Sequence, residues 1–404
     1  MKIGLITIGN ELLSGFTTNT NASWIGKRMS EIGAEIVWHH TVQDSHEAIV
    51  NSFNSIPTYL NALIITGGLG PTHDDITANS LFDWADVETE FDDDYWQDLK
   101  RRFKSRHISI PDLNKNQALK PINGELIPNP LGSARGIQLQ KNGMDIVALP
   151  GVPVEMKAMM VESVIPFLKI NIQNPIHILT LRTTGIMESA LAEKLEPILK
   201  NINAKLAFLP KLTGVDLRIS SKDKKSLTTL KESIYQRVGK YIFGENGISL
   251  EEIVGKLILD KQLTISIAES CTGGLISDRL TNVPGSSGYL LGSVIAYQNE
   301  VKISKLGVKK ETIEKFGAVS EQTANEMAKG IRSSLKSNLG LSSTGIAGPG
   351  GGSEEKPVGL VYIALANDEE VLTKKLNLTK NRLANKKLTS QAAINLLRLY
   401  LLRE

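Results

Sequence analysis

Five short apolar runs in this chain each end in a segment rich in glycine and small polar residues. The runs span residues 2–8, 62–66, 145–149, 264–268 and 339–344. Helix-like spacing of apolar residues separates most of them, and strands that alternate with helices in this way form parallel sheets. Ligands bind beyond the carboxyl ends of such strands, at the loops that follow them. The pattern therefore predicts an α/β protein whose glycine loops surround bound ligands.

The order of the expected elements divides the 404 residues into three parts. We expect a parallel-sheet α/β domain over residues 1–171, a small α+β module over 172–247 and a second α/β domain over 248–404. The first part carries a charged helical excursion near 83–106 and a hairpin at Asn142-Gly143. A chain of this length has room for two to four domains at about 100–200 residues each.

The composition excludes several classes of protein. Apolar residues make up 41% of the chain and the formal charge is +3, which excludes a disordered chain and argues against a nucleic-acid binder that works by bulk charge. The single cysteine, Cys271, excludes an intramolecular disulfide and a cysteine-based zinc site. No signal-peptide pattern and no apolar run of about 18 residues occur. We therefore expect a cytoplasmic protein that neither spans a membrane nor binds nucleic acid directly.

Three of the glycine-containing loops belong to the first part of the chain. They begin at Gly9, Gly67 and Pro150, and we expect all three at the same edge of one sheet. Glycines let backbone N–H groups approach a phosphate closely, and a helix predicted to start near Asp74 adds a positive dipole end. Asp74 and Asp75 are suited to hold Mg²⁺ between the protein and a phosphate. The structural alternative is a tight turn in which Asp74 caps the helix.

A strand-to-helix turn in the last part carries a hydroxyl next to a thiol. The segment TISIAESCTGG places Ser270 and Cys271 where helix N–H groups can stabilise an oxyanion. A nucleophilic serine needs a base. No histidine follows His177, which excludes a Ser-His-Asp triad within this part. Lys302 of YQNEVK is the candidate base if desolvation keeps it neutral, with Tyr297 relaying its proton or orienting it.

Alternatives remain for each of these side chains. A thiol attacks amides well, so Cys271 is a second candidate nucleophile, and only one of two adjacent residues should face the site. The loop at 343–353 is suited to wrap a small ligand, and Arg382 can meet a phosphate at the start of the last helix. The structural readings are a helix cap for Ser270, a buried filler for Cys271, and solvated cations for Lys302 and Arg382.

These motifs resemble those of the CinA (competence/damage-inducible) family over essentially the whole chain. TGGLGPTHDD, NPLGSARG and PGVPVEM resemble its N-terminal domain, which is similar to the molybdopterin-binding fold. LRTTGIMESALAEKL resembles its middle segment. AESCTGG, PGSSGY, YQNEVK, GAVS and STGIAGPGGGSEEKPVG resemble its nicotinamide-nucleotide amidase domain. The resemblance implies hydrolysis of nicotinamide mononucleotide to nicotinate mononucleotide and ammonia without a cofactor. It also implies a metal-dependent ADP-ribose pyrophosphatase in the first domain, and a homodimer.

The resemblance also assigns residues to roles. Ser270 would attack the carboxamide carbon, with Lys302 and Tyr297 as its catalytic partners. The set expected around the oxyanion and substrate is Cys271, Thr272, Gly273, Gly274, Ser286, Thr344, Gly345, Ala347, Gly348 and Arg382. The set expected around a nucleotide in the first domain is Gly9, Asn10, Glu11, Gly67, Gly68, Gly70, Thr72, Asp74, Ser133 and Gly151, with Asp75 as the metal ligand. His73 departs from the family pattern, and we expect it to fill the loop.

Two other functions stay open at this point. One is a nucleotide-binding regulatory protein, linked to competence or DNA damage, whose first domain performs no catalysis. The other is a molybdopterin-handling enzyme, which the fold resemblance alone suggests. The intact AESCTGG and YQNEVK motifs favour the amidase over both. The sequence leaves open whether Glu188 of the GIMES segment reaches an active site or a domain interface.

Overall fold

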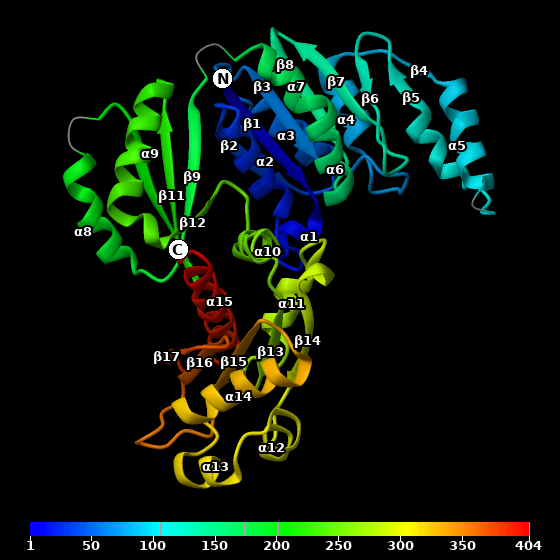
Figure 1. The fold of residues 1–404 in the computed structure, drawn as a ribbon. Coiled ribbons are helices and arrows are strands. Elements are labelled where there is room, and N and C mark those ends of the chain that lie inside the picture. The colour runs from blue at the N-terminus through cyan, green and yellow to red at the C-terminus, as the bar shows by residue number, and fades with distance from the viewer. Residues whose placement is uncertain (106, 173–174, 200–201, 404) are drawn as a thin grey trace. The chain divides into compact units, whose positions relative to one another are not determined.

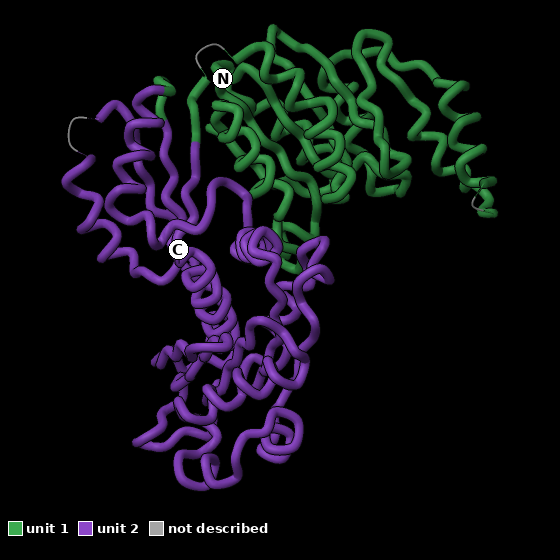
Figure 2. Tube along the Cα trace, viewed as in Figure 1, with its two compact units in different colours: residues 1–178, 221–224 green, residues 179–220, 225–404 purple. Residues whose placement is uncertain are grey.

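The computed structural model describes residues 1–105, 107–172, 175–199 and 202–403. The chain forms two compact units, which are shown in different colours in Figure 2. The first consists of residues 1–178 and 221–224, and the second of residues 179–220 and 225–404. Among the described residues, no helix is both long and apolar enough to cross a membrane.

The first unit is built on a six-stranded sheet with the order β2-β1-β3-β8-β7-β6 (Figure 1). The four parallel strands are β1 (Lys2–Ile8), β2 (Glu35–Val42), β3 (Ala62–Thr66) and β8 (Met144–Leu149). Two short antiparallel strands, β7 (Gly136–Lys141) and β6 (Glu125–Ile127), complete it. Every residue of β3 is buried, as expected for a parallel strand that helices cover on both faces.

Two apolar cores lie on the two faces of this sheet. The first core packs α2 (Thr20–Glu31), α6 (Pro153–Met159), a π-helical turn (Met160–Val164) and α7 (Ile165–Ile170) against one face. The second packs α3 (His46–Asn54) and α4 (Thr77–Ala85) against the other. The predicted hairpin is confirmed: Asn142 and Gly143 join β7 to β8 with φ values of 52° and 76°. Positive φ at both positions is what a two-residue type I′ turn requires.

The charged excursion predicted near 83–106 is helical for about two thirds of its length. It contains the end of α4, the short strand β4 (Thr89–Phe91) and α5 (Asp93–Ser105). A 3₁₀ turn (Asp112–Ala118) and β5 (Leu119–Pro121) follow, and β5 pairs with β4 in a separate two-stranded sheet. Acidic residues begin α5 and basic residues end it, an arrangement that the helix dipole favours.

The middle module forms a four-stranded sheet with the order β10-β11-β9-β12. Its strands are β9 (His177–Thr183), β10 (Lys205–Lys211), β11 (Gly214–Ser221) and β12 (Ile242–Glu245). Two helices, α8 (Glu188–Leu199) and α9 (Lys224–Val238), pack on it. All six elements occur in the predicted order, because each strand and helix of this small module shows its own apolar period.

The last part of the chain forms a five-stranded sheet with the order β14-β13-β15-β16-β17 (Figure 1). The parallel strands are β13 (Ile265–Glu269), β14 (Leu290–Ile295) and β15 (Leu339–Gly345). The antiparallel strands are β16 (Leu360–Ala366) and β17 (Val371–Asn377). The expected alternation with helices is wrong here, since only loops connect β15, β16 and β17. The glycine- and proline-rich residues 346–359 cannot continue a helix.

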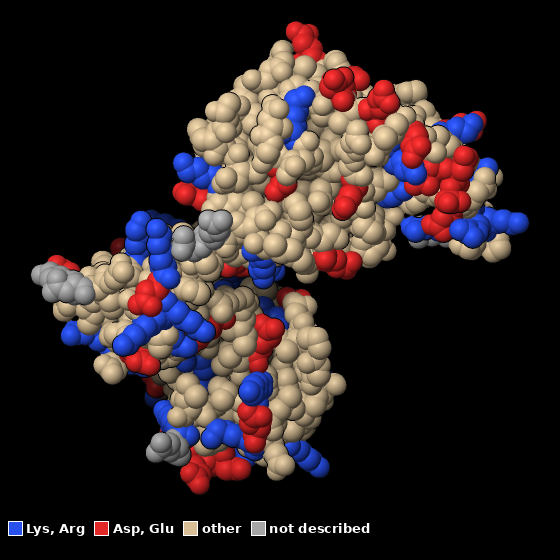
Figure 3. Space-filling view, turned by 90° about the horizontal axis from the view of Figure 1, so that it is seen from above, with Lys and Arg blue, Asp and Glu red and all other residues tan. Residues whose placement is uncertain are grey.

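Helices cover this sheet on both faces. The helix α14 (Glu321–Leu335) packs on one face, and α10 (Leu250–Asp260), α11 (Leu275–Thr281) and α15 (Arg382–Leu401) pack on the other. Two shorter helices, α12 (Asn299–Leu306) and α13 (Lys310–Phe316), follow β14. On the molecular face seen in Figure 3, acidic and basic side chains lie among one another, which agrees with a formal charge of only +3.

Candidate functional site

The turn between β13 and α11 has a backbone that only glycine adopts easily. Gly273 and Gly274 have φ values of 59° and 93°, in the left-handed region. The Ser270 N–H donates to the Ser343 carbonyl over 2.9 Å, which ties the turn to the end of β15. The Gly273 N–H donates to the Ser270 carbonyl over 3.1 Å. It is therefore already engaged, whereas the Thr272 N–H has no hydrogen-bond partner among the described residues.

The buried carboxylate of Glu269 fixes the direction of α11, a role that sequence reasoning missed. Its side chain has no exposed surface. One carboxylate oxygen accepts from the Ser277 N–H over 2.8 Å and from its hydroxyl over 2.6 Å, and the other accepts from the Ile276 N–H over 3.1 Å. Glu269 therefore satisfies N–H groups in the first turn of α11, where a negative charge is stabilised by the helix dipole. It positions the turn that carries Ser270.

Ser270 and Cys271 have different surroundings. Ser270 is 8% exposed, and its hydroxyl has no hydrogen-bond partner among the described residues. Cys271 belongs to an apolar cluster that includes Ile267 and Leu341. Burial in that cluster raises the pKa of the Cys271 thiol to about 12, so the reactive thiolate is scarce near neutral pH. These surroundings favour the hydroxyl as the nucleophile and a packing role for the thiol.

The side chain of Lys302 is buried beside this turn. Lys302 is 1% exposed, and its Nζ donates to the main-chain carbonyls of Ala296 over 2.8 Å and of Tyr297 over 3.3 Å. The Ala296 N–H donates to the Glu269 carbonyl over 2.7 Å, so the end of β14 lies against the end of β13. Burial lowers the pKa of Lys302, and this effect outweighs the charges of Cys271 and Glu300, which raise it. The structural alternative of a solvated lysine is therefore wrong.

A neutral Lys302 amine has the shape that a general base needs here. The neutral group has two N–H donors and one lone pair, whereas the ammonium has three donors. The two carbonyls at the end of β14 can accept both N–H groups. The lone pair of the amine is then free to accept a proton from another group.

Arg382 and Tyr297 meet at the glycine loop that follows β15. Arg382 begins α15 and donates through Nη1 to the Gly348 carbonyl over 2.8 Å and through Nη2 to the Tyr297 hydroxyl over 2.5 Å. Asn385, on the same helix, donates to the Ala347 carbonyl over 2.9 Å. The Tyr297 hydroxyl therefore contacts Arg382, while only its main-chain carbonyl contacts Lys302. This geometry makes Tyr297 a partner of the arginine and not a direct proton relay to the lysine.

Lys386 is a further cation at this site that sequence reasoning missed. It lies one helical turn after Arg382 on α15, and its Nζ is 3.5 Å from where a Cβ on Gly273 would be. No hydrogen bond or ion pair involves its ammonium group within the described part of the chain. The i, i+4 spacing of Arg382 and Lys386 was the signal that could have identified it.

The remaining predicted residues of this set are divided between two ends of the sheet. Thr272 shares a hydrogen bond of 2.7 Å with Ser343, and Thr344 donates to the Ala318 carbonyl over 2.6 Å, so both hydroxyls hold loops together. Gly345 is tightly packed, since a Cβ there would lie within 3.0 Å of Val361. Ser286 precedes β14 in a 3₁₀ turn (Ser286–Gly288), at the amino end of that parallel strand. Its expected place beside the nucleophile is therefore wrong.

The three glycine loops of the first unit do meet at one edge of its sheet. They follow β1, β3 and β8, which are neighbouring parallel strands. The Gly67 N–H donates to the Leu149 carbonyl over 3.1 Å, and a Cβ on Gly151 would lie 3.3 Å from the Gly67 Cα. Gly67 has a φ of 115° and Gly68 a φ of 65°, and a Cβ on Gly67 would overlap the Ile8 carbonyl. These glycines are therefore required by close packing of the loops themselves.

Carboxylates gather at the same edge. One oxygen of Asp75 accepts from the Thr72 N–H over 2.9 Å and from its hydroxyl over 2.5 Å. Asp44, which sequence reasoning missed, accepts from the Asn10 N–H over 2.8 Å. Burial raises the pKa of Asp44, and repulsion from Glu11, Asp74 and Asp75 raises it further. This accumulation of negative charge is a feature that a divalent cation would relieve.

Other expectations at this edge need correction or stay open. The helix predicted near Asp74 is α4, which begins at Thr77, and no side chain caps it, so the capping alternative for Asp74 is wrong. Ser133 lies in the loop before β7, where its carbonyl accepts from the Tyr95 hydroxyl over 2.6 Å. His73 is exposed. Among the described residues, no three His, Cys, Asp or Glu side chains form a group that could hold a metal by themselves.

Glu188 lies at an interface within the second unit. It begins α8 and lines a cavity of about 410 Å³ together with Met187 of the middle module and Leu388 of α15. The cavity lies between the middle module and α15, the helix that carries Arg382. Glu188 therefore lies at a domain interface, which is one of the two possibilities that the sequence left open.

Comparison with known proteins identifies three matching regions. The description "probable molybdopterin binding domain" matches residues 4–170, "damage-inducible protein CinA KH domain" matches 179–244, and "CinA C-terminal domain" matches 248–401. A protein of Halothermothrix orenii named competence-damage inducible protein is 42% identical over 98% of this chain and 98% of its own length. One of Clostridium novyi with that name is 39% identical over 100% and 99%. The crystal structure of the competence/damage inducible protein CihA from Agrobacterium tumefaciens is 39% identical, covers 38% of this chain and 97% of its own, and has a TM-score of 0.36.

Proposed function

Because this chain belongs to the CinA family of competence-damage inducible proteins, we propose that its last domain is a serine amidase that hydrolyses nicotinamide mononucleotide. The products are nicotinate mononucleotide and ammonia. The observation that carries this proposal is the buried Lys302, whose pKa is lowered by desolvation beside the turn that holds Ser270. Ser270 and Lys302 follow the neighbouring strands β13 and β14, and a hydroxyl paired with a lysine that can exist as the free amine is a nucleophile with its base.

The proposed reaction uses these two side chains in succession. The Ser270 Oγ attacks the carboxamide carbon while neutral Lys302 takes the hydroxyl proton. The resulting ammonium then gives that proton to the nitrogen of the leaving group, so ammonia departs and an acyl-serine ester remains. Water attacks the ester with Lys302 again as base, which releases the carboxylate and restores the hydroxyl. In this proposal the Thr272 N–H at the turn stabilises the oxyanion.

The two cations of α15 would bind the phosphate of the substrate. Arg382 and Lys386 lie on one face of the helix at its amino-terminal turns, where the helix dipole also favours an anion. Lys386 lies beside Gly273 of the nucleophile turn, so a phosphate there would hold the rest of the nucleotide near Ser270. This arrangement supports a phosphorylated amide as the substrate.

Replacing Lys386 by methionine is expected to raise the KM for nicotinamide mononucleotide by roughly 10-fold to 100-fold, since a hydrogen bond to a charged group contributes about 1.5–3 kcal/mol. The kcat should change much less, because the phosphate does not react. Steady-state ammonia release measures both constants. Lys387→Met removes the same charge from the exposed neighbouring position and should leave KM unchanged. An unchanged KM in the Lys386 variant would contradict this role.

The first domain supports a second activity, metal-dependent hydrolysis of ADP-ribose. Three glycine loops at one sheet edge suit a diphosphate, and the carboxylates around Asp44 and Asp75 are hard oxygen ligands suited to Mg²⁺. Because Mg²⁺ is often bound by one or two carboxylates together with substrate phosphates, a complete protein cage is not needed. When bound, the metal would neutralise phosphate charge. The rival function is a domain that binds the nucleotide without cleaving it.

Replacing Asp75 by asparagine is expected to lower Mg²⁺-dependent ADP-ribose cleavage by about 100-fold or more, because the amide cannot supply the charge that a metal requires. The protein should retain its full rate of ammonia release from nicotinamide mononucleotide. The matched control is Asp86→Asn, at the end of α4. Nucleotide binding without cleavage in the unaltered protein would support the regulatory alternative instead.

A further inference from the structure

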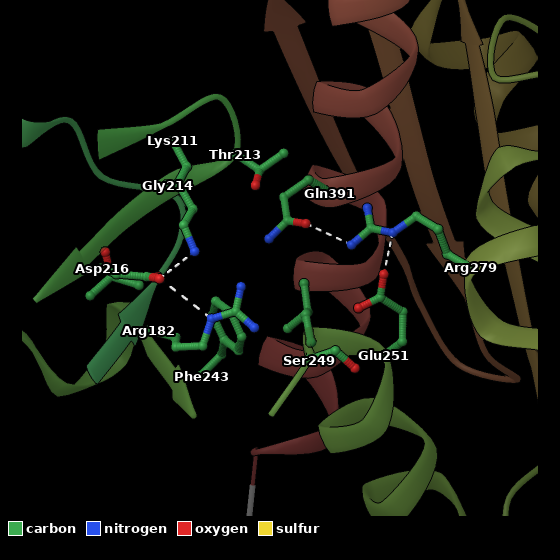
Figure 4. Close-up of a pocket in the computed structure, with 12 residues that line it drawn as sticks. Arg182, Lys211, Thr213, Gly214, Asp216, Phe243, Ser249, Glu251, Arg279 and Gln391 are labelled. Carbon is green, nitrogen blue, oxygen red and sulfur yellow. Dashed lines mark hydrogen bonds and ion pairs between the residues drawn. The ribbon is translucent and has the colours of Figure 1, made fainter. Parts of the chain in front are cut away.

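The second unit contains a polar cavity that the proposed amidase does not use. It has a volume of about 250 Å³ and is lined by the middle module on one side and by α10, α11 and α15 on the other (Figure 4). Three cations line it, Arg182 and Lys211 from the middle module and Arg279 from α11. Two carboxylates, Asp216 and Glu251, also line it. The charged groups of the wall therefore carry a surplus of one positive charge.

The surplus lies on the wall that the middle module contributes. Lys211 Nζ lies 2.5 Å from one oxygen of Asp216, and Arg182 Nε lies 3.5 Å from the other. Two cations therefore share one carboxylate. The Arg182 Nη1 donates to the Ile248 carbonyl over 2.6 Å, but its Nη2 has no hydrogen-bond partner among the described residues. The Arg182 guanidinium is 5.1 Å from the centre of the Phe243 ring, which restrains its orientation.

The opposite wall is held rigid by Arg279. Its Nε pairs with Glu251, its Nη1 donates to the Ser390 hydroxyl over 2.9 Å, and its Nη2 donates to the Gln391 side chain over 2.7 Å. Gln391 in turn donates to the Thr184 hydroxyl over 3.1 Å. Each nitrogen of the Arg279 guanidinium has a partner in this hydrogen-bond network, so Arg279 fixes the shape of the cavity. The cations that remain available to a ligand therefore belong to the wall that the middle module contributes.

The amino-terminal turn of α10 also lines the cavity. Ser249 caps this 11-residue helix, and its hydroxyl accepts from the Glu252 N–H over 3.2 Å. The N–H groups of Leu250 and Glu251, at the first two positions of the helix, have no partner within it. The positive end of the helix dipole also lies at the cavity, although the carboxylates of Glu251 and Glu252 in the same turn offset part of it.

We propose that this cavity binds a small anion that carries one phosphate group. The volume admits a ligand of the size of a pentose phosphate and is smaller than a typical pocket for a larger ligand, about 300–1,000 Å³. Arg182 Nη2 and Lys211 would contact the phosphate, since a guanidinium and an ammonium are its usual partners. The ligand would lie against α11 and α15, the two helices that begin at the nucleophile turn and at Arg382. Binding of the ligand to this cavity does not depend on the proposed amidase function. Any effect of the ligand on amidase activity does rest on that function.

Titration calorimetry of the full-length protein with inorganic phosphate and, separately, with ribose 5-phosphate tests this proposal. Lys211→Met should weaken the binding of at least one probe by about tenfold or more, because the net charge of the wall falls from +1 to zero. The Lys211 side chain is 51% exposed, so the variant should fold, and thermal unfolding checks this. Lys205→Met, at an exposed position of the same strand, removes an equal charge outside the cavity and should bind normally.

Lys386→Met separates this cavity from the phosphate position proposed in the amidase. Binding that depends on Lys211 and survives in the Lys386 variant supports the cavity, even if the amidase proposal fails. The cavity proposal is overturned if binding is lost in the Lys386 variant while the Lys211 variant binds as tightly as the unaltered protein. The absence of heat with both probes at millimolar concentration overturns it as well.

Discussion

Replacing Ser270 by alanine is expected to lower the rate of ammonia release from nicotinamide mononucleotide by at least about 1,000-fold. In serine hydrolases the loss of the nucleophile alone costs as much as the loss of the whole catalytic group, which is on the order of 10⁶-fold in kcat. The fold should be unaffected, because the Ser270 hydroxyl has no partner among the described residues while its backbone bonds to Ser343 and Gly273 remain. Substrate should still bind, so equilibrium binding of the nucleotide is the check on folding.

The matched control is Cys271→Ala. Its thiol packs in the apolar cluster and has a pKa of about 12, so the variant should keep the rate within the same order of magnitude. Its melting temperature should fall, since removal of a buried side-chain atom leaves a small cavity. If the Ser270 variant kept near-normal turnover and the Cys271 variant had none, the thiol would be the nucleophile and the hydroxyl would not.

The strands of this chain could be predicted closely from sequence because each is short, apolar and bounded by glycine or a polar turn. The runs at 2–8 and 62–66 coincide with β1 and β3. Both are buried on two faces, so no alternation with polar residues obscures the apolar signal. The edge at which their loops meet followed from the topology of parallel strands. The part of the site that belongs to single strand ends could therefore be anticipated.

Residues whose importance depends on folding at a distance could not be anticipated in this way. Glu269 acts on N–H groups seven and eight residues further on, in a helix whose start is set by two left-handed glycines. Lys386 meets Gly273 only because α15 packs beside α11. Asp44 follows β2, and only the sheet order brings it near Asp75. Ser286 shows a different error: the family resemblance predicts it beside the nucleophile, but it precedes β14 and therefore lies at the amino end of that parallel strand.

Replacing Lys302 by methionine is expected to lower kcat/KM for ammonia release by roughly 100-fold to 10,000-fold, the usual contribution of a general base. Methionine is close in length to lysine and suits a buried position, so the variant tests the amine and not the packing.

In the unaltered protein only the neutral amine accepts the Ser270 proton. Activity should therefore rise with pH and level off above the pKa of Lys302, which burial holds below the usual lysine value. The methionine variant should lose this rise, because no group is left to titrate. Lys305→Met, at an exposed position of α12, removes an equal charge and should keep both the rate and the pH profile. A Lys302 variant with an unchanged pH profile would mean that another group accepts the proton, whatever its rate.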